Sequence, residues 1–257
     1  MFFRPDYDEN GKKVLCEMNG VNADMLMDIY VKKMTKGETL EICEENNECA
    51  ILLLAGNVNF TVGNTINENC ARKNPFEKTP YAVHFCKGTK AVVTAIEDSE
   101  VLVQMTDNDK TWDSVFYNPE NCLYQHFGKG QWEGTGYRIV STMFDLDNAP
   151  YSNMVMGEVF NQQGRWSSYP PHHHPQPEVY YYQFNPCQGF GAGFEGDDVY
   201  KTENGTCLCI RGGKAHQQVT APMYEMYYVW LIRHLENDPW DKTRIYLDEH
   251  EWIANAE

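Results

Sequence analysis

The sequence predicts an all-β protein built from two successive units. Short β-prone segments recur along most of the 257 residues, and turn residues drawn from 19 glycines and 12 prolines separate them. Aromatic side chains make up 13% of the sequence, which favours many short strands over long helices. The length fits either one large β domain or two domains of roughly 100–130 residues, and an irregular stretch in the middle favours two.

The first half of the chain contains one helix candidate followed by a series of strands. Residues 22–24, Asn-Ala-Asp, are suited to cap an amphipathic helix that ends near Gly37. Beyond that point the apolar residues alternate with polar ones or form short continuous runs, as expected of strands. The expected strands cover residues 40–42, 49–54, 58–62, 81–85, 91–96 and 101–105. Residues 67–80 are predicted to form a polar loop, and the acidic residues 97–100 a hairpin turn.

Residues 106–136 are irregular, and we place the domain boundary there. The predicted domains are residues 1–130 and residues 131–257; before the irregular stretch the first domain contains one histidine, His84, and no H-x-H, so no metal site is expected there. The second domain repeats the strand pattern. Its expected strands cover residues 137–144, 154–160, 178–184, 189–200, 205–211, 216–220 and 223–231. In the last of these, the even-numbered side chains from Tyr224 to Trp230 share one face. The acidic tail is expected to pack on the outside as a terminal strand or helix.

Charge and composition exclude several classes of partner. The formal net charge is −16 and no basic run exceeds Lys32-Lys33, so nucleic acid is not an expected partner. Any acid that the protein binds must meet a locally placed arginine or lysine, because the overall charge repels anions. No apolar stretch reaches the ~20 residues that span a bilayer, and the N-terminus lacks the apolar core of a secretion signal. Nine cysteines without a framework spacing fit reduced thiols and a cytoplasmic location. Cys207 and Cys209 are expected to be buried strand residues.

The chemistry-bearing stretch is residues 164–189, GRWSSYPPHHHPQPEVYYYQFNPCQG. In an extended chain His172 and His174 share a face and the histidine between them points away. Glu178 opens a strongly β-prone segment. Two imidazoles and a carboxylate this close together can hold one divalent cation if a fourth ligand comes from elsewhere. His216, which follows a Gly-Gly turn, is the candidate. Each histidine alone has a simpler reading as a solvated or ordinary buried side chain, but the combination predicts a metal site.

The order and spacing of these residues resemble the two sequence motifs of the cupin family. The first motif is H-x-H followed by Glu178, and the second is G-x-x-H ending at His216. This resemblance implies a bicupin, two tandem double-stranded β-helix (jelly-roll) barrels of which only the second binds metal; closed barrels of this kind remove exposed strand edges. The approach from Gly164 to His172 is longer than the usual family pattern, which changes the entry loop and leaves the ligands in place.

A narrower resemblance follows from W-S-S-Y-P-P-H-x-H, which begins at Trp166, and from E-V-Y-Y-Y-Q-F-N-P-C-Q-G-F, which begins at Glu178. Both are similar to the 5-deoxyglucuronate isomerase family of bacterial inositol catabolism, whose sister group is the 4-deoxy-5-hexosulose-uronate ketol-isomerases of pectin breakdown. The second half of the chain matches well and the first half loosely. There are two departures: His173 stands where that family commonly has lysine, and the region after Phe190 lacks the expected Gln-Arg pair.

The family resemblance implies one divalent metal ion held by His172, His174, Glu178 and His216. It also implies an intramolecular oxidoreductase, an aldose–ketose isomerase that converts 5-deoxy-glucuronate to 5-dehydro-2-deoxy-gluconate. Three imidazoles and one carboxylate suit zinc, manganese, iron, cobalt or nickel, and zinc or manganese is the predicted ion.

Isomerisation moves a proton between neighbouring carbons, and both a Lewis-acid metal and a positioned base lower its barrier. Glu178 is a candidate base if its second oxygen is free, and Tyr182 and Tyr228 are candidates for proton donation or for packing alone. The candidates for binding the substrate carboxylate are Arg165, Arg211 and Lys214. Guanidinium forks match carboxylates, although each of these residues has an alternative role as an exposed charge at a strand end.

Three other functions are compatible with the same residues. They are the related uronate isomerisation of pectin breakdown, an Fe(II) cupin dioxygenase, and a cupin that binds a sugar acid without converting it. Oxygen consumption would indicate the dioxygenase, and tight binding without conversion would indicate the binding protein. The expected partner is a small-molecule sugar-acid substrate. Edge strands and abundant aromatic residues also predict a homo-oligomer.

Overall fold

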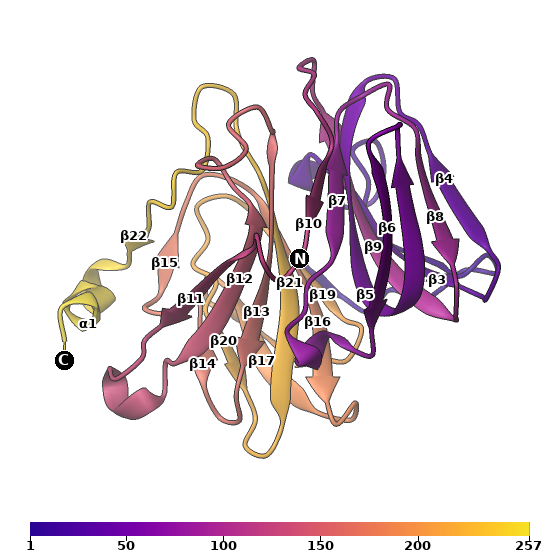
Figure 1. Ribbon diagram of the computed structural model, residues 1–257. Helices are drawn as coiled ribbons and strands as arrows, with labels where there is room; N and C mark the ends of the chain where they lie inside the picture. The colour runs from indigo at the N-terminus through magenta and orange to yellow at the C-terminus, as the bar shows by residue number, and fades with distance from the viewer. Residues whose placement is uncertain (257) are drawn as a thin grey trace. The chain divides into compact units, whose positions relative to one another are not determined.

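The computed structural model describes residues 1–256 and confirms the all-β prediction (Figure 1). The chain forms two compact units. The N-terminal unit comprises Asp6–Cys122 and Met143–Met154, and the C-terminal unit comprises Met1–Pro5, Leu123–Thr142 and Val155–Glu257. These boundaries differ from the predicted division at residue 130, because strand pairing and side-chain packing join segments that are distant in sequence. Strand β1 (Phe2–Phe3) pairs with β19 (Cys207–Ile210) in the C-terminal unit.

The N-terminal unit is a nine-stranded antiparallel sheet folded around strand β5 (Asn47–Val62), which pairs with β6, β7, β8 and β9. The other strands are β2 (Lys12–Cys16), β3 (Asp28–Met34), β4 (Thr39–Ile42), β6 (Ile66–Arg72), β7 (Ala82–Phe85), β8 (Ala91–Ala95), β9 (Ser99–Asp107) and β10 (Val115–Tyr117). Two short 3-10 turns, η1 (Ala23–Met25) and η2 (Pro75–Glu77), interrupt them. The predicted separate strands at 49–54 and 58–62 are parts of the one long strand β5.

The predicted helix between residues 22 and 37 is wrong. The structure has only the 3-10 turn η1 there, followed by β3, which pairs with β2 and β9. Asn22 does not cap a helix, because its backbone is left-handed (φ 55°) and its side-chain amide donates a hydrogen bond to the Leu15 carbonyl at 3.0 Å. The cross-strand pairs on both edges of β3 outweigh the local helical pattern, since propensity is weaker than tertiary context.

Two further local predictions differ from the structure. The polar loop predicted at 67–80 begins instead as strand β6, in which Asn69 accepts a side-chain hydrogen bond from Asn59 on β5 at 3.1 Å. Residues 67–69 of β6 are exposed, so their polarity marks a solvent-facing part of the strand. The predicted hairpin at 97–100 is absent as such, because β8 pairs with β4 and β5 whereas β9 pairs with β3 and β5.

The C-terminal unit consists of a seven-stranded sheet in the order β1-β19-β16-β21-β13-β12-β11, a four-stranded sheet in the order β14-β20-β17-β18, and the pair β15-β22. Its remaining strands are β11 (Leu123–Phe127), β12 (Arg138–Phe144), β13 (Met154–Asn161), β14 (Trp166–Ser167), β15 (His172–His173), β16 (Glu178–Asn185), β17 (Phe190–Glu195), β18 (Asp198–Glu203), β20 (Gln218–Thr220), β21 (Glu225–Arg233) and β22 (Ile245–Tyr246). The 3-10 turns η3 (Trp132–Gly134) and η4 (Asp248–His250) and the one-turn helix α1 (Glu251–Ala254) complete it.

The core of the C-terminal unit is formed by alternate residues of β16 and β21, which are paired along their whole length. From β16 it contains Tyr180, Tyr182 and Phe184, and from β21 it contains Met226, Tyr228, Trp230 and Ile232. The predicted two-residue periodicity of both segments is therefore confirmed. Cys207 and Cys209 are buried on β19, as predicted.

Candidate metal centre

Three segments of the C-terminal unit bring the predicted metal ligands together. His172 lies on β15, His174 lies on the loop that follows, and Glu178 is the first residue of β16. His216 comes from the loop before β20. All four side chains are at most 5% exposed. They are therefore ordered parts of the fold, which excludes the simpler reading of a solvated histidine cluster.

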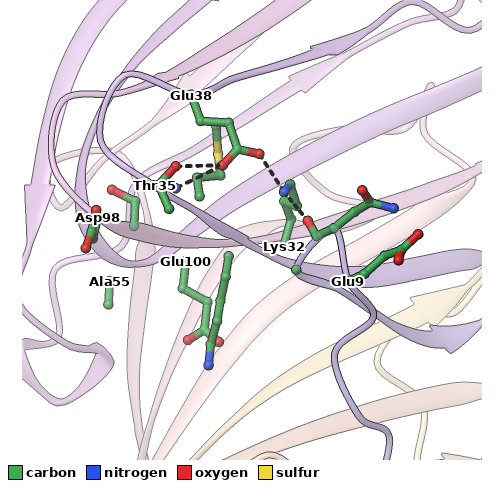
Figure 2. Close-up of a pocket in the computed structure, with 12 residues that line it drawn as sticks. Glu9, Lys32, Thr35, Glu38, Ala55, Asp98 and Glu100 are labelled. Carbon is green, nitrogen blue, oxygen red and sulfur yellow. Dashed lines mark hydrogen bonds and ion pairs between the residues drawn. The ribbon is translucent and has the colours of Figure 1, made fainter.

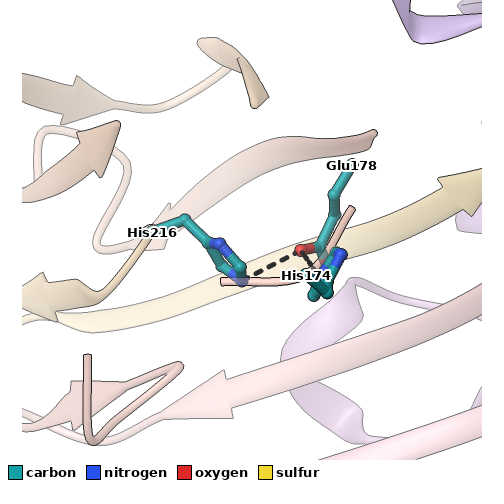
Figure 3. Close-up of side chains that lie close together, drawn as sticks. All are labelled: His174, Glu178 and His216. Atoms are coloured by element: carbon teal, nitrogen blue, oxygen red, sulfur yellow. Dashed lines mark ion pairs between the residues drawn. The ribbon is translucent and has the colours of Figure 1, made fainter. Parts of the chain in front are cut away.

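The tightest group is His174, Glu178 and His216, whose ligand atoms all lie within 4.8 Å of one another (Figure 3). Glu178 Oε2 is 3.3 Å from His174 Nε2 and 3.2 Å from His216 Nε2. The fourth predicted ligand, His172, is not part of this group. Its ring packs edge-on against that of His216, with ring centroids 4.9 Å apart.

Backbone carbonyls orient all three imidazole rings. Each Nδ1–H donates to a carbonyl oxygen: His172 to Pro170 at 2.8 Å, His174 to Gln176 at 3.0 Å, and His216 to Lys214 at 2.9 Å. A carbonyl oxygen only accepts, so Nδ1 carries the proton and the lone pair of the neutral ring lies on Nε2. Ligand histidines of metalloproteins are held in this way by partners of the other ring nitrogen.

The electrostatics of the site favour neutral rings. Burial, together with the charges of neighbouring groups, lowers the pKa of His172 well below its usual value and that of His216 to about 4. At neutral pH these rings are acceptors at Nε2. Glu178 Oε2 is buried and receives no hydrogen bond. Acceptor atoms thus converge on one point without a donor among them, an arrangement that costs free energy unless a cation lies between them. Two imidazoles and a carboxylate are suitable ligands for a divalent metal ion.

The glycines of residues 212–213 allow the two parts of the site to meet. A Cβ atom on Gly212 would lie 1.8 Å from the carbonyl oxygen of Pro175, so only glycine fits this approach. Gly213 has a left-handed backbone (φ 80°), and its N–H donates to the His174 carbonyl at 2.8 Å. The turn that leads to His216 is therefore bonded directly to the loop that carries His174.

The two tyrosines predicted near the metal are both buried and protonated. Burial raises the pKa of Tyr228 to about 12 and that of Tyr182 well above its usual value. Tyr182 Oη donates to Gln218 Oε1 at 2.6 Å, and Gln218 Nε2 donates to the His216 carbonyl at 2.7 Å. Tyr182 therefore positions the His216 segment. Tyr228 Oη donates to Ser167 Oγ at 2.9 Å.

The three residues predicted to bind the substrate carboxylate lie in different surroundings. Arg211 Nε pairs with Glu195 at 2.9 Å, and its side chain is 55% exposed. Lys214 is exposed, and its carbonyl is the group that orients His216. Arg165 is half-buried, with its guanidinium 5.0 Å from the ring centre of Tyr137.

Residues of the C-terminal tail also surround the histidines, and sequence reasoning missed them. Strand β22 pairs with β15, with Tyr246 opposite His172, and the two rings are 6.2 Å apart. The Trp240 ring lies 6.2 Å from that of His174. Arg244, one position before β22, is close enough that its charge contributes, after burial, to the lowered pKa values of His172 and His216. The available signal was that Arg244 is the one arginine of the acidic tail 234–257.

The N-terminal unit contains a buried histidine–carboxylate pair with a different character. His84 Nε2 lies 3.0 Å from Glu48 Oε2, and both side chains are completely buried. Glu48 also accepts hydrogen bonds from Ser152 Oγ at 3.0 Å and from the Asn153 N–H at 2.6 Å. The His84 ring stacks on Phe144 with centroids 4.1 Å apart. This carboxylate has donors on both oxygens, as expected of a structural pair.

A cavity of about 700 Å³ in the N-terminal unit is lined by charged side chains (Figure 2). Lys32 Nζ pairs with Glu38 Oε1 at 2.6 Å, and Glu38 Oε2 accepts from the Thr35 N–H at 2.9 Å. Neither histidine nor cysteine lines this cavity. Its lining is net acidic, with four carboxylates against two lysines, and it offers no imidazole or thiol ligand, so the C-terminal cluster remains the candidate site.

The family assignment rests on a match across almost the whole chain. The model of the KduI/IolB family matches residues 2–253. The chain belongs to the KduI/IolB family. The resemblance predicted from the motifs around the histidines is thereby confirmed, and it extends to the first half of the chain, where the motifs alone matched only loosely.

Relatives in the KduI/IolB family include proteins named 5-deoxy-glucuronate isomerase. The one from Geobacillus thermodenitrificans (strain NG80-2) is 28% identical over 252 residues, which cover 88% of this chain and 85% of the relative. The one from Bacillus subtilis (strain 168) is 25% identical over 266 residues, which cover 95% and 94% of the two chains.

Solved structures confirm the bicupin fold. An IolB-like protein from Salmonella typhimurium LT2 superposes with a TM-score of 0.87 at 22% identity and covers 98% of both chains. An oxalate decarboxylase from Lactobacillus farciminis superposes with a TM-score of 0.68 at 12% identity and covers 100% of this chain and 90% of its own. Within residues 1–256, no helix has the length and apolar character needed to cross a membrane.

Proposed function

We propose that this KduI/IolB protein is a metal-dependent aldose–ketose isomerase that converts 5-deoxy-glucuronate to 5-dehydro-2-deoxy-gluconate in inositol catabolism. The observation that carries the proposal is the convergence of His174 Nε2, His216 Nε2 and Glu178 Oε2, which face one another without a donor. The names of the relatives support the substrate class.

His174, Glu178 and His216 would hold the ion, and His172, whose ring contacts that of His216, is the candidate fourth ligand. Zinc or manganese is the proposed ion, and iron, cobalt and nickel suit the same donors. When bound, a divalent ion polarises a substrate carbonyl and stabilises the negative charge that develops on its oxygen.

The side chains around the site differ in their ability to accept and to donate a proton. The hydroxyl-bearing carbon beside the carbonyl must lose a proton and the carbonyl carbon must gain one, while the proton of that hydroxyl moves to the former carbonyl oxygen. Tyr182 and Tyr228 keep their protons at neutral pH because burial raises the pKa of each phenol, so neither can accept the proton that leaves carbon. Glu178 has two carboxylate oxygens, and we assign to it the acceptor role in addition to cation binding. Tyr228 has one O–H, which donates to Ser167 Oγ, so it can stabilise an oxygen that gains charge only by exchanging that partner for it.

The direct test follows conversion of the sugar acid by the purified, metal-loaded protein. We expect the aldehyde proton of 5-deoxy-glucuronate to disappear from the ¹H NMR spectrum as the ketone forms, and chelation of the metal to stop this. His216→Ala should remove most of the metal and the activity. His126→Ala is a suitable control, because His126 is exposed and contacts Tyr137. Full activity in the metal-free protein or in His216→Ala would refute the proposal.

The same samples separate the other functions. Conversion of 4-deoxy-5-hexosulose uronate in place of the 5-deoxy acid would indicate the related reaction of pectin breakdown. Rapid oxygen uptake by the iron-loaded protein would indicate a dioxygenase, and binding without conversion would indicate a sugar-acid-binding cupin. Homo-oligomerisation and a cytoplasmic location stay predictions, which light scattering and cell fractionation would measure.

A further inference from the structure

The C-terminal tail places an arginine without a carboxylate partner beside the metal centre. Arg244 is half-buried, immediately before β22, the strand that pairs with the histidine-bearing strand β15 (Figure 1). Its guanidinium lies 5.1 Å from the ring centre of Phe127. Among residues 1–256 it forms neither an ion pair nor a hydrogen bond.

A second arginine adds positive charge at the same place. The guanidinium of Arg138 lies 5.2 Å from the same Phe127 ring. Arg138 is only 4% exposed, and it donates to the carbonyls of Gly136 at 3.0 Å and Tyr169 at 3.1 Å. These neutral partners leave its charge uncompensated. Burial and the neighbouring charge of Arg244 lower the pKa of Arg138 to about 10. Two like charges that share one aromatic ring are stabilised when an anion lies beside them.

The two arginines predicted from the sequence to bind the substrate carboxylate, Arg211 and Arg165, lie in other surroundings than Arg244. Arg211 is already neutralised by the buried Glu195. Arg165 also has no carboxylate partner among the described residues, and its buried Nη1 has no hydrogen-bond acceptor; it lies over Tyr137, on the segment that leads into β14. Arg244 alone of the three directly precedes a strand, β22, that pairs with the strand carrying His172, and its charge reaches both His172 and His216.

We propose that Arg244 binds the carboxylate of the sugar-acid substrate, while the charge of Arg138, which lies against the same Phe127 ring, strengthens this anion site. The inference rests on the proposed function and deepens it: the reacting carbonyl end of the substrate lies at the His174–Glu178–His216 group and the acid end at Arg244. A guanidinium fork matches a carboxylate in geometry and charge. Arg244 and Arg138 also supply the local positive charge that an acidic protein needs in order to bind an anionic substrate.

Binding of two stable probes tests this assignment without turnover. D-glucuronate and its neutral amide, D-glucuronamide, differ in charge at one end only, and isothermal titration calorimetry measures the affinity of the metal-loaded protein for each. We expect the wild-type protein to prefer glucuronate by about 10- to 100-fold, the range expected for hydrogen bonds to a charged group. Arg244→Gln should reduce this preference to near unity, and Arg244→Lys, which keeps the charge without the fork, should retain part of it.

Arg4→Gln is the matched control, because Arg4 also lies over a phenylalanine ring, Phe2, and pairs with Glu203. It should keep the full preference. An unchanged preference in Arg244→Gln, its loss in Arg165→Gln or Arg211→Gln instead, or the absence of any preference in the wild type would overturn the assignment. This test is separable from the test of the proposed function. If the selectivity for the carboxylate depends on Arg244 but no isomerisation is detected, this inference is supported and the proposed isomerase reaction is refuted.

Discussion

Replacing Glu178 by glutamine distinguishes a metal centre from an ordinary buried ion pair, because the two predict opposite changes in stability. In the metal-free protein Glu178 Oε2 faces His216 Nε2 at 3.2 Å and His174 Nε2 at 3.3 Å and receives no hydrogen bond. Both Nδ1 protons are already donated to carbonyls. The amide of a glutamine at position 178 would supply the missing donor and remove a buried negative charge.

The expected gain follows from the cost of an unsatisfied buried group, about 1–3 kcal/mol. Glu178→Gln should therefore raise the free energy of unfolding of the metal-free protein by that amount. At roughly 2–4 °C per kcal/mol for a chain of this size, Tm should rise by several degrees. If Glu178 instead formed a satisfied ion pair with a protonated histidine, the same substitution would cost about 3–5 kcal/mol. The wild type should gain about 2.7 kcal/mol when zinc or manganese is present at 100 times its Kd, whereas Glu178→Gln should gain much less.

Thermal and chemical denaturation of chelator-treated and metal-loaded samples would measure both quantities. Glu48→Gln is the matched control: Glu48 is also completely buried, but it accepts hydrogen bonds from Ser152 and Asn153 and pairs with His84. That substitution should destabilise the protein with and without metal. A large loss of stability in metal-free Glu178→Gln, together with a wild type whose Tm does not respond to metal, would refute the reasoning.

Three further predictions concern the supports of the site. The folded-state pKa of His216, about 4, lies below the ~6.5 of an unfolded histidine, so the folded protein binds fewer protons between these values. The stability of the metal-free protein should thus be intact above about pH 6.5 and fall towards pH 4 by up to ~1.4 kcal/mol per pH unit. Tm measured across this range should fall less steeply with decreasing pH in His216→Ala than in the wild type. Gly212→Ala should cost at least about 1–3 kcal/mol and lower the metal content found by elemental analysis, because its Cβ would lie 1.8 Å from the Pro175 oxygen; unchanged metal content would contradict this close approach. Tyr182→Phe should cost about 1–3 kcal/mol by leaving Gln218 Oε1 buried without a donor, and calorimetric titration should show weaker metal binding, since Gln218 also holds the His216 carbonyl. Wild-type metal affinity in Tyr182→Phe would show that this chain of hydrogen bonds does not position His216.

Much of the C-terminal unit could be predicted because side-chain direction in a strand is a local property. The alternation in β16 and β21 assigned Tyr182 and Tyr228 to the core, and both are buried there. The chemistry of H-x-H and Glu178 likewise follows from residue type and spacing within a few positions. The spacing did not show that His172 would lie outside the tight three-residue group.

The errors came from contacts between segments that are distant in sequence. The stretch from Asn22 to Met34 has a plausible helical pattern, yet pairing with β2 and β9 makes its second part a strand. Residues Met1–Pro5 join the C-terminal unit because β1 pairs with β19. No local pattern in either stretch specifies its partner strand.

By itself, the sequence determined the all-β class, the face on which each side chain of the main strands lies, and the set of atoms able to hold a cation. The tertiary structure alone decided which of these atoms meet, that Gly212 lies against Pro175, and that the tail brings Arg244 to the histidines. The physical reason is that residue type and a period of two act over a few neighbouring residues, whereas a binding site depends on which distant strands pair and in what register.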